Sequence, residues 1–289
     1  MGIKYRRIPI LSIGRDVYLD TRLILQKLEQ VAPERPRLAA DSTPEHHIIE
    51  RLLEVLTIDG GLFRRIVQMM PADLPHMKNE AFLKDRADLI GGAIVFTADA
   101  LNAARPEAIN EVRRTVQLLE TLLADDRKWL LRTESPSLAD IEAVWPLHWL
   151  VSVPGALPQE FISATLYPKV FCWIQRFQEF VSAAEKALPA PETMSGKQAS
   201  ETIVAALYNE EEGQVDENDP VIQHQNLRKG DPIQSWPTDS GSMHRDSGVL
   251  VSINAEEVVI DTTAGDLTVR LHAPRHGFRV SSARNDAGN

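Results

Sequence analysis

The first thirty residues have the order strand, turn, strand and helix, and this order restricts the fold more than any other part of the chain. A short apolar run around Pro9 is followed by a turn at Gly14 and a second short strand at 17–19. Asp20 or Thr21 can cap the helix that comes next. Because proline has no backbone donor, the first strand lies at the edge of its sheet or its proline has another use. The segment predicts a β-hairpin followed by a helix.

The overall composition limits the class of protein. The 289 residues carry a formal net charge of −10, which argues against a general nucleic-acid binder, because such proteins need clustered Lys and Arg. Cys172 is the only cysteine, so an internal disulfide is excluded. No apolar run reaches the roughly 18 residues of a membrane-spanning helix. We therefore expect a cytoplasmic protein with neither nucleic acid nor a membrane among its partners.

The middle of the chain has helical spacing of apolar residues from Pro44 to about Leu188. A proline-rich stretch before Pro44 has the composition of a linker. We expect one long helix over 79–104 and another that begins at Pro106, because proline is favoured in a first helical turn. Ser137 and Asp140 have the spacing of a capping box at the start of a further helix, and their predicted role is structural.

After Pro189 the sequence changes character. The acidic residues from Glu210 to Asp219 repel one another, so we expect a linker there. Beyond them, β-rich runs separated by turn residues predict four or five short strands. So small a sheet has a marginal core, and we expect it to pack against the helical domain. The predicted fold is α+β, mainly α, divided into 1–32, 44–188 and a linker with β-rich appendage at 195–289.

Two features of the first thirty residues could form a binding site. A helix N-terminus offers free N–H groups and a positive dipole end, so Thr21 could bind a carboxylate while Asp20 pairs with an ammonium. A cis bond between Ile8 and Pro9 would expose the backbone of Ile8 to a ligand. Each feature also has an ordinary interpretation, as a plain N-cap and as an edge-strand proline. Only their combination favours a ligand site.

Taken together, these motifs resemble those of glutathione-transferase-like proteins, specifically the fungal type with a C-terminal β-rich extension. The resemblance is strongest over 4–30 and 137–150, and stretches such as 63–65, 71–75 and 82–86 also match the helical domain of that family. It implies a partial thioredoxin-like lobe at 1–32 and an all-helical transferase C-terminal domain at 44–188.

The resemblance also implies a site. In such proteins the residues that match Ile8, Pro9, Asp20 and Thr21 bind glutathione, which would be a substrate or ligand here, and the partner is a small-molecule electrophile. A first β-α-β unit normally supplies the serine, cysteine or tyrosine that acts on the glutathione sulfur. No residue of this chain matches that group, so the catalytic residue stays unassigned and we expect an N-terminally truncated form. The alternative is a non-catalytic binding or dimerisation protein, with a homodimer left open.

Other chemically active side chains are weaker candidates. Cys172 adjoins Trp173 on an apolar helix, so we expect a buried structural thiol. His272 and His276 lie near a turn with His244 upstream, and we expect solvated histidines there and no metal site, since further ligands are not identified.

Overall fold

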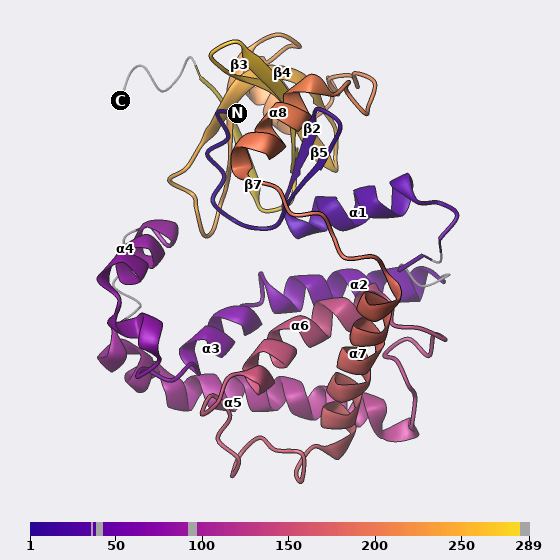
Figure 1. The fold of residues 1–289 in the computed structure, drawn as a ribbon, viewed down its shortest axis with the longest axis vertical. Coiled ribbons are helices and arrows are strands. Elements are labelled where there is room, and N and C mark those ends of the chain that lie inside the picture. The colour runs from indigo at the N-terminus through magenta and orange to yellow at the C-terminus, as the bar shows by residue number, and fades with distance from the viewer. Residues whose placement is uncertain (36, 39–42, 92–96, 284–289) are drawn as a thin grey trace. The chain divides into compact units, whose positions relative to one another are not determined.

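The computed structural model describes residues 1–35, 37–38, 43–91 and 97–283. They divide into two compact units (Figure 1). The sheet unit comprises Met1–Ala32, Lys84–Ala93 and Glu192–Asn289, and the helical unit comprises Pro33–Leu83 and Ile94–Pro191. The fold is α+β and mainly α, as predicted. None of the described helices is long and apolar enough to cross a membrane.

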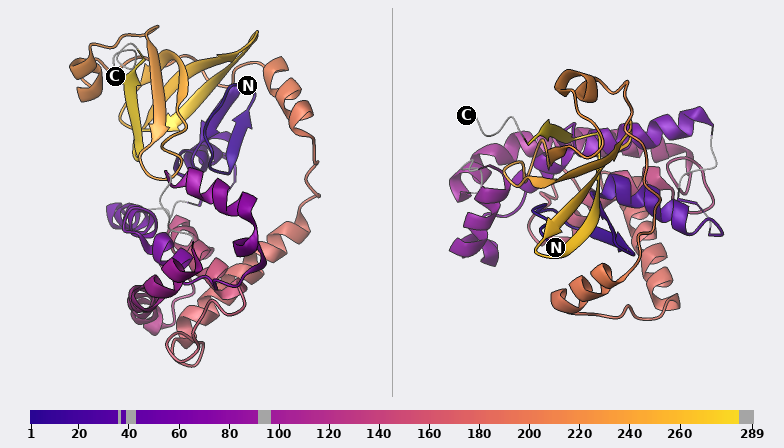
Figure 2. Two further views of the ribbon diagram at one scale, coloured as in Figure 1. Left: turned by 90° about the vertical axis from the view of Figure 1, so that its left-hand side faces the viewer. Right: turned by 90° about the horizontal axis from the view of Figure 1, so that it is seen from above.

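The sheet unit contains a seven-stranded sheet in the order β1-β2-β6-β5-β4-β3-β7. Its strands are β1 (Ile10–Ile13), β2 (Asp16–Leu19), β3 (Pro232–Pro237), β4 (Asp246–Ile253), β5 (Glu257–Ala264), β6 (Leu267–Pro274) and β7 (Phe278–Ser282). Its helices are α1 (Thr21–Val31), α8 (Gly196–Ala205) and α9 (Pro220–Gln225). The β1–β2 hairpin lies beside the strands of the tail in both views of Figure 2. β2 and β6 are parallel, with Asp16 opposite Arg270 and Tyr18 opposite His272, and the other pairs are antiparallel.

The two ends of the chain therefore share one sheet, which differs from the expected arrangement. We predicted a separate lobe at 1–32 and a tail that packs against the helical domain. Val17 and Leu19 of β2 share a buried core with Leu271 of β6 and Ile260 of β5, so residues 1–32 do not form a lobe separate from the tail. A two-stranded hairpin is marginal alone, and the tail strands bury its apolar face.

The helical unit is built around one large buried core. Its elements are α2 (Pro44–Thr57), α3 (Leu62–Gln68), the 3₁₀ turn η1 (Pro75–Lys78), α5 (Ala98–Leu122), the 3₁₀ turn η2 (Leu123–Asp125), α6 (Leu138–Ser152) and α7 (Pro168–Ala187). A further helix, α4 (Glu80–Leu89), has its first residues in this unit and its last residues in the sheet unit.

The single helix predicted over 79–104 is wrong. α4 ends at Leu89, and Gly91 has a φ of 75°, a left-handed conformation that favours glycine and stops a helix. Residues 92–96 of the predicted span lie outside the described residues. α5 begins after Thr97, whose side chain accepts a hydrogen bond from the backbone N–H of Ala100. Pro106, expected in a first turn, lies inside α5.

The capping box at the start of α6 is formed, and Asp140 makes further contacts. The backbone N–H and hydroxyl of Ser137 both donate to Asp140 Oδ2 at 3.0 Å. The backbone N–H of Leu130 and the Trp173 indole N–H donate to Oδ1 at 2.9 Å. Asp140 is fully buried, so one carboxylate joins the start of α6 to α7 and to the segment before α6.

Candidate functional site

The four residues expected to bind glutathione lie directly before the β1–β2 hairpin and at the start of α1. The Ile8–Pro9 peptide bond is cis, as the sequence predicted, and Ile8 is 89% exposed. Asp20 is the N-cap of α1, and its side chain accepts a hydrogen bond from the Arg22 backbone N–H at 3.2 Å. Thr21, the first residue of the helix, is exposed. A polar side chain therefore faces solvent at the first turn of α1.

The loop that leads to Ile8 is held by residues of the tail. The Tyr5 ring stacks on Phe278 with 6.0 Å between centroids, and the Arg7 guanidinium also lies over the Phe278 ring. Arg7 forms ion pairs with Asp20 at 3.4 Å and with Asp239 at 3.0 Å. Asp20 thus already has a cationic partner, which a ligand ammonium would have to share or replace. Sequence reasoning missed Arg7 and its tail partners because local patterns carry no information on contacts across 230 residues.

A second anchor of the same loop is Asp246 at the start of β4. Its carboxylate accepts a hydrogen bond from the Lys4 backbone N–H at 2.5 Å. Asp246 is 1% exposed, and burial outweighs the amide hydrogen bonds and raises its pKa to about 6. Arg6 pairs with Asp85 and Asp88 of α4. The loop is therefore fixed on several sides before any ligand binds.

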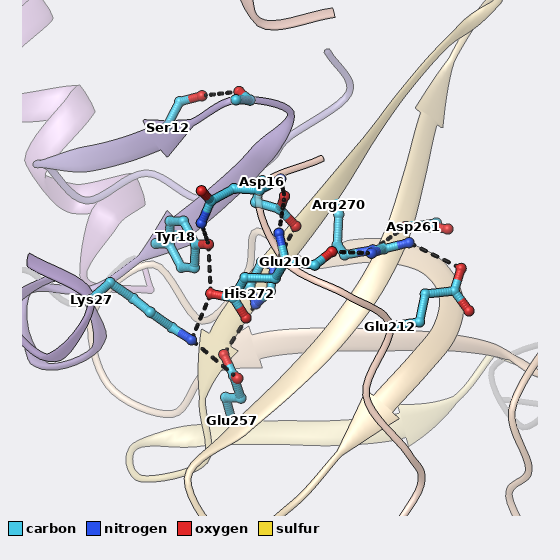
Figure 3. A network of polar contacts seen from close by, with 12 residues as sticks. Ser12, Asp16, Tyr18, Lys27, Glu210, Glu212, Glu257, Asp261, Arg270 and His272 are labelled. Atoms are coloured by element: carbon cyan, nitrogen blue, oxygen red, sulfur yellow. Dashed lines mark hydrogen bonds and ion pairs between the residues drawn. The ribbon is translucent and has the colours of Figure 1, made fainter. Parts of the chain in front are cut away.

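The most extensive polar cluster of the described sheet unit lies where the hairpin meets the tail (Figure 3). We call it the His272 network, and its members are Asp16, Tyr18, Lys27, Glu210, Glu257 and His272. His272 is 1% exposed, with Nε2 2.8 Å from Asp16 Oδ1 and Nδ1 3.1 Å from Glu257 Oε2. A carboxylate can only accept, so both ring nitrogens donate and the ring is an imidazolium. Our expectation of a solvated His272 is wrong, because β6 lies between β2 and β5.

The charges of the network set the direction of the pKa shifts of His272, Asp16 and Glu257. Burial alone would lower the pKa of His272, but the hydrogen bonds to Asp16 and Glu257 raise it. Burial disfavours ionised Asp16, yet hydrogen bonds from His272 and from the Asn209 backbone lower its pKa. For Glu257, burial is likewise outweighed, by His272 and by Lys27, and its pKa is lowered. The ionised forms stabilise one another.

Lys27 completes the network from α1, and Figure 3 shows its side chain directed toward two carboxylates. Its Nζ lies 2.8 Å from Glu210 Oε1 and 3.4 Å from Glu257 Oε1. The Tyr18 hydroxyl donates to the same Glu210 oxygen at 2.7 Å. Asp16 Oδ2 accepts from the backbone N–H of Asn209 at 2.5 Å. These contacts attach the start of the acidic segment to β2 and α1.

The acidic run is therefore no free linker, contrary to our expectation. Besides Glu210, Glu212 pairs with Arg270 at 3.1 Å and with Lys229 at 2.6 Å. Arg270 also pairs with Asp261 of β5 at 3.2 Å. The acidic side chains of the run repel one another. Lys27 of α1, Arg270 of β6 and Lys229 after α9 offset this repulsion by pairing with them.

The network also has to be considered as a metal site. Ligand atoms of Glu210, Glu257 and His272 lie within 4.8 Å of one another. However, the Lys27 ammonium already lies between the two carboxylates, and both nitrogens of His272 donate to acids. A metal would have to displace Lys27 and deprotonate His272. The geometry fits an ammonium and an imidazolium, and its chemical role is to join β2, β5, β6 and α1.

Cys172, expected to be buried, is exposed. Its neighbour Trp173 faces the core with no exposed surface, as part of a buried face of α7 that includes Val170 and Ile174. Adjacent positions on a helix point in different directions, so the apolar neighbourhood in the sequence did not bury the thiol.

Comparisons with known proteins agree with this architecture. A domain of unknown function (DUF7962) matches residues 65–186. No curated protein matches the chain. Among solved structures it is similar to a GST-like protein from Pseudomonas syringae, with 22% identity and a TM-score of 0.64 over 96% of this chain and 82% of that one. It is also similar to the glutathione S-transferase Blo t 8, with 16% identity and a TM-score of 0.42 over 64% of this chain and 70% of that one. The first likeness shows that the chain has a glutathione-transferase-like fold.

Proposed function

We propose that this chain is a glutathione-transferase-like protein that binds glutathione at the hairpin and the start of α1. The observation that carries the proposal is the exposed pair of Ile8 and Thr21 on one hairpin–helix segment of a glutathione-transferase-like fold. The Ile8 backbone would pair with the backbone of the ligand, and Thr21 with the helix amides would bind its γ-glutamyl carboxylate. Asp20, with Arg7 beside it, would bind the ammonium of the same group.

We further propose that conjugation to a small electrophile needs a preceding β-α-β unit that supplies the group acting on the sulfur. A free thiol has a pKa of about 8.5. A hydrogen bond to the thiolate lowers this pKa, so that more of the glutathione sulfur is in its nucleophilic form at neutral pH. Among the described strands, β1 pairs only with β2 and forms one edge of the sheet. This edge has the unpaired backbone groups that another strand requires.

Titration calorimetry with glutathione tests the binding proposal. We expect binding by the 289-residue chain and an affinity about tenfold lower for Thr21→Ala, because a charge-assisted hydrogen bond is lost. Thr121→Ala, an exposed threonine of α5, is the matched control and should bind like the parent. Absence of binding at millimolar glutathione, or equal losses in both variants, would contradict the proposed site.

A conjugation assay with a generic electrophile at saturating glutathione tests the second part. We expect little turnover by the chain alone and recovery when a β-α-β unit is fused before it, because binding without thiolate activation gives no rate gain. Robust turnover by the chain alone would mean that one of its own residues activates the sulfur.

Exposed apolar side chains on one face of α2 favour the alternative, a non-catalytic binding or dimerisation protein. Ile48 is 57% exposed and Leu52 60% exposed, whereas Glu50 and Glu54 of the same helix are buried. An exposed apolar stripe of this kind is typical of an interaction surface. If it forms a homodimer, Leu52→Lys should give monomers in sedimentation velocity, and Leu207→Lys, at another exposed leucine, should not. A monomeric parent protein would exclude this role for α2.

A further inference from the structure

The sheet unit contains a groove that none of the proposed glutathione-site residues lines. It has a volume of about 890 Å³ and is bordered by α9, β3 and β7. We call it the tail groove. The side chains that give it its chemical character are Asp219, His224, Trp236, Arg245, Arg275 and Arg279. Its size falls in the range of small-molecule sites, roughly 300–1,000 Å³.

An arginine–tryptophan stack forms one wall of the tail groove. The Arg245 guanidinium lies 4.3 Å from the Trp236 ring centroid, and its Nη1 donates to Gln234 Oε1 at 3.3 Å. Trp236 pairs directly with Arg279 across β3 and β7, so the two side chains share a face of the sheet. Arg245 is exposed, and a guanidinium that stacks on an indole can also stack with a planar ring.

The charge of the tail groove is opposite to that of the whole chain. Three arginines line it, although the chain has a net charge of −10. Its one carboxylate, Asp219, pairs with Arg275 at 2.9 Å. The Arg279 side chain is exposed, and its guanidinium has no hydrogen-bond or ion-pair partner among the residues that the structure describes. Guanidinium groups of this kind bind carboxylates and phosphates in a bidentate manner.

We propose that the tail groove binds a small anion that carries a planar aromatic ring. The ring stacks on the face of the Arg245 guanidinium that is opposite the Trp236 indole. The anionic group pairs with Arg279, with Arg275 as a second cation. This site is independent of the proposed glutathione site, because neither Ile8, Pro9, Asp20 nor Thr21 contributes to it.

Adenosine 5′-monophosphate combines both features and serves as the probe, titrated calorimetrically into the full chain. Adenosine lacks the anion and ribose 5-phosphate lacks the ring. We expect both to bind at least about tenfold more weakly than the nucleotide. Arg279→Gln and Arg245→Gln should each weaken nucleotide binding about fivefold or more. Arg114→Gln, at a 70% exposed arginine of α5 outside the groove, is the matched control and should leave binding unchanged.

Three results would overturn the proposal. The first is failure of both adenosine 5′-monophosphate and 1-naphthyl phosphate to bind at several millimolar. The second is nucleotide binding that Arg279→Gln weakens no more than Arg114→Gln does. The third is equal affinity for ribose 5-phosphate and the nucleotide, which would remove the ring from the recognised chemistry. Glutathione titrations of the same variants separate this site from the proposed function, since Arg279→Gln should bind glutathione like the parent.

Discussion

Replacing His272 by glutamine should loosen the attachment of the hairpin to the tail. The imidazolium donates to Asp16 at 2.8 Å and to Glu257 at 3.1 Å. A glutamine amide can donate to one carboxylate but presents its carbonyl oxygen to the other. One buried acid would then face an acceptor instead of a cation.

The size of the effect follows from the partners that remain. A hydrogen bond to a charged group contributes about 1.5–3 kcal/mol, and removing one member of a buried ionic pair costs about 3–5 kcal/mol. Lys27 still pairs with Glu257 at 3.4 Å, and the Asn209 N–H still donates to Asp16, so the lower end applies. We expect a loss of about 3 kcal/mol, a large share of the 5–15 kcal/mol typical of a domain.

The loss should depend on pH. An unfolded histidine has a pKa of about 6.5, and the fold raises the pKa of His272. A group whose pKa is raised by folding stabilises the fold fully below its unfolded pKa and loses that contribution as the pH rises through the folded value. The difference between the parent and His272→Gln should therefore be largest at about pH 6 and shrink at alkaline pH.

Hydrogen exchange measured by mass spectrometry can locate the effect. Amides of β2 and β6 should exchange about a hundredfold faster in His272→Gln at pH 6, while α5 and α7 of the helical unit serve as an internal reference. His276→Gln, at an exposed histidine of the same tail, is the matched control. Unchanged protection of β2 and β6 in His272→Gln, or equal losses in both variants, would refute the charge reasoning.

Three further outcomes are expected from the same structure. In urea denaturation Ser137→Ala should cost about 1 kcal/mol and Asp140→Ala about 3 kcal/mol, because the second change also leaves buried donors of Leu130 and Trp173 unpaired. Folding raises the pKa of Asp246 to about 6, so the ionised carboxylate destabilises the folded state at pH 7. Asp246→Asn should therefore raise the free energy of unfolding of the sheet unit by about 2–3 kcal/mol at pH 7. This gain should disappear below about pH 4, where the carboxyl is protonated in the folded and the unfolded state. Residues 220–289 alone should show no cooperative thermal transition, because β6 would lack its partner β2; a sharp transition would contradict this.

Local signals predicted local structure. The hairpin, the helix after Asp20 and the capping box of Ser137 and Asp140 each depend on contacts within a few residues, and the structure has all three. The strands of the tail also followed from β-rich runs between turn residues. Of the candidate site, the sequence predicted the exposed hairpin and helix start. It could not predict that Arg7 holds Asp20, because the tail residues that fix Arg7 are more than 200 positions away.

The errors came from residues whose partners are distant in the sequence. His272 is 256 residues from Asp16. The alternation of apolar and polar residues from Leu267 to Ala273 places His272 on a polar face, but both faces of this strand are buried. The acidic run was interpreted from its own charges alone, whereas Lys27 and Arg270 determine its conformation.

The polar groups at the junction of hairpin and tail determine the pairing of β2 with β6 as well as its strength. Apolar contacts of Val17 and Leu19 exclude a shift by one residue, which would turn both side chains away from the core, but they discriminate weakly against a shift by two residues. The Asp16 carboxylate is different, because it is fully buried and only the observed register places it beside His272. A shift by two residues would keep these side chains on the same faces of the sheet, but it would move Asp16 relative to His272 and leave buried charges without their present partners, at a cost of several kcal/mol. We infer that the hydrophobic core drives association of the two ends and that the His272 network selects their register.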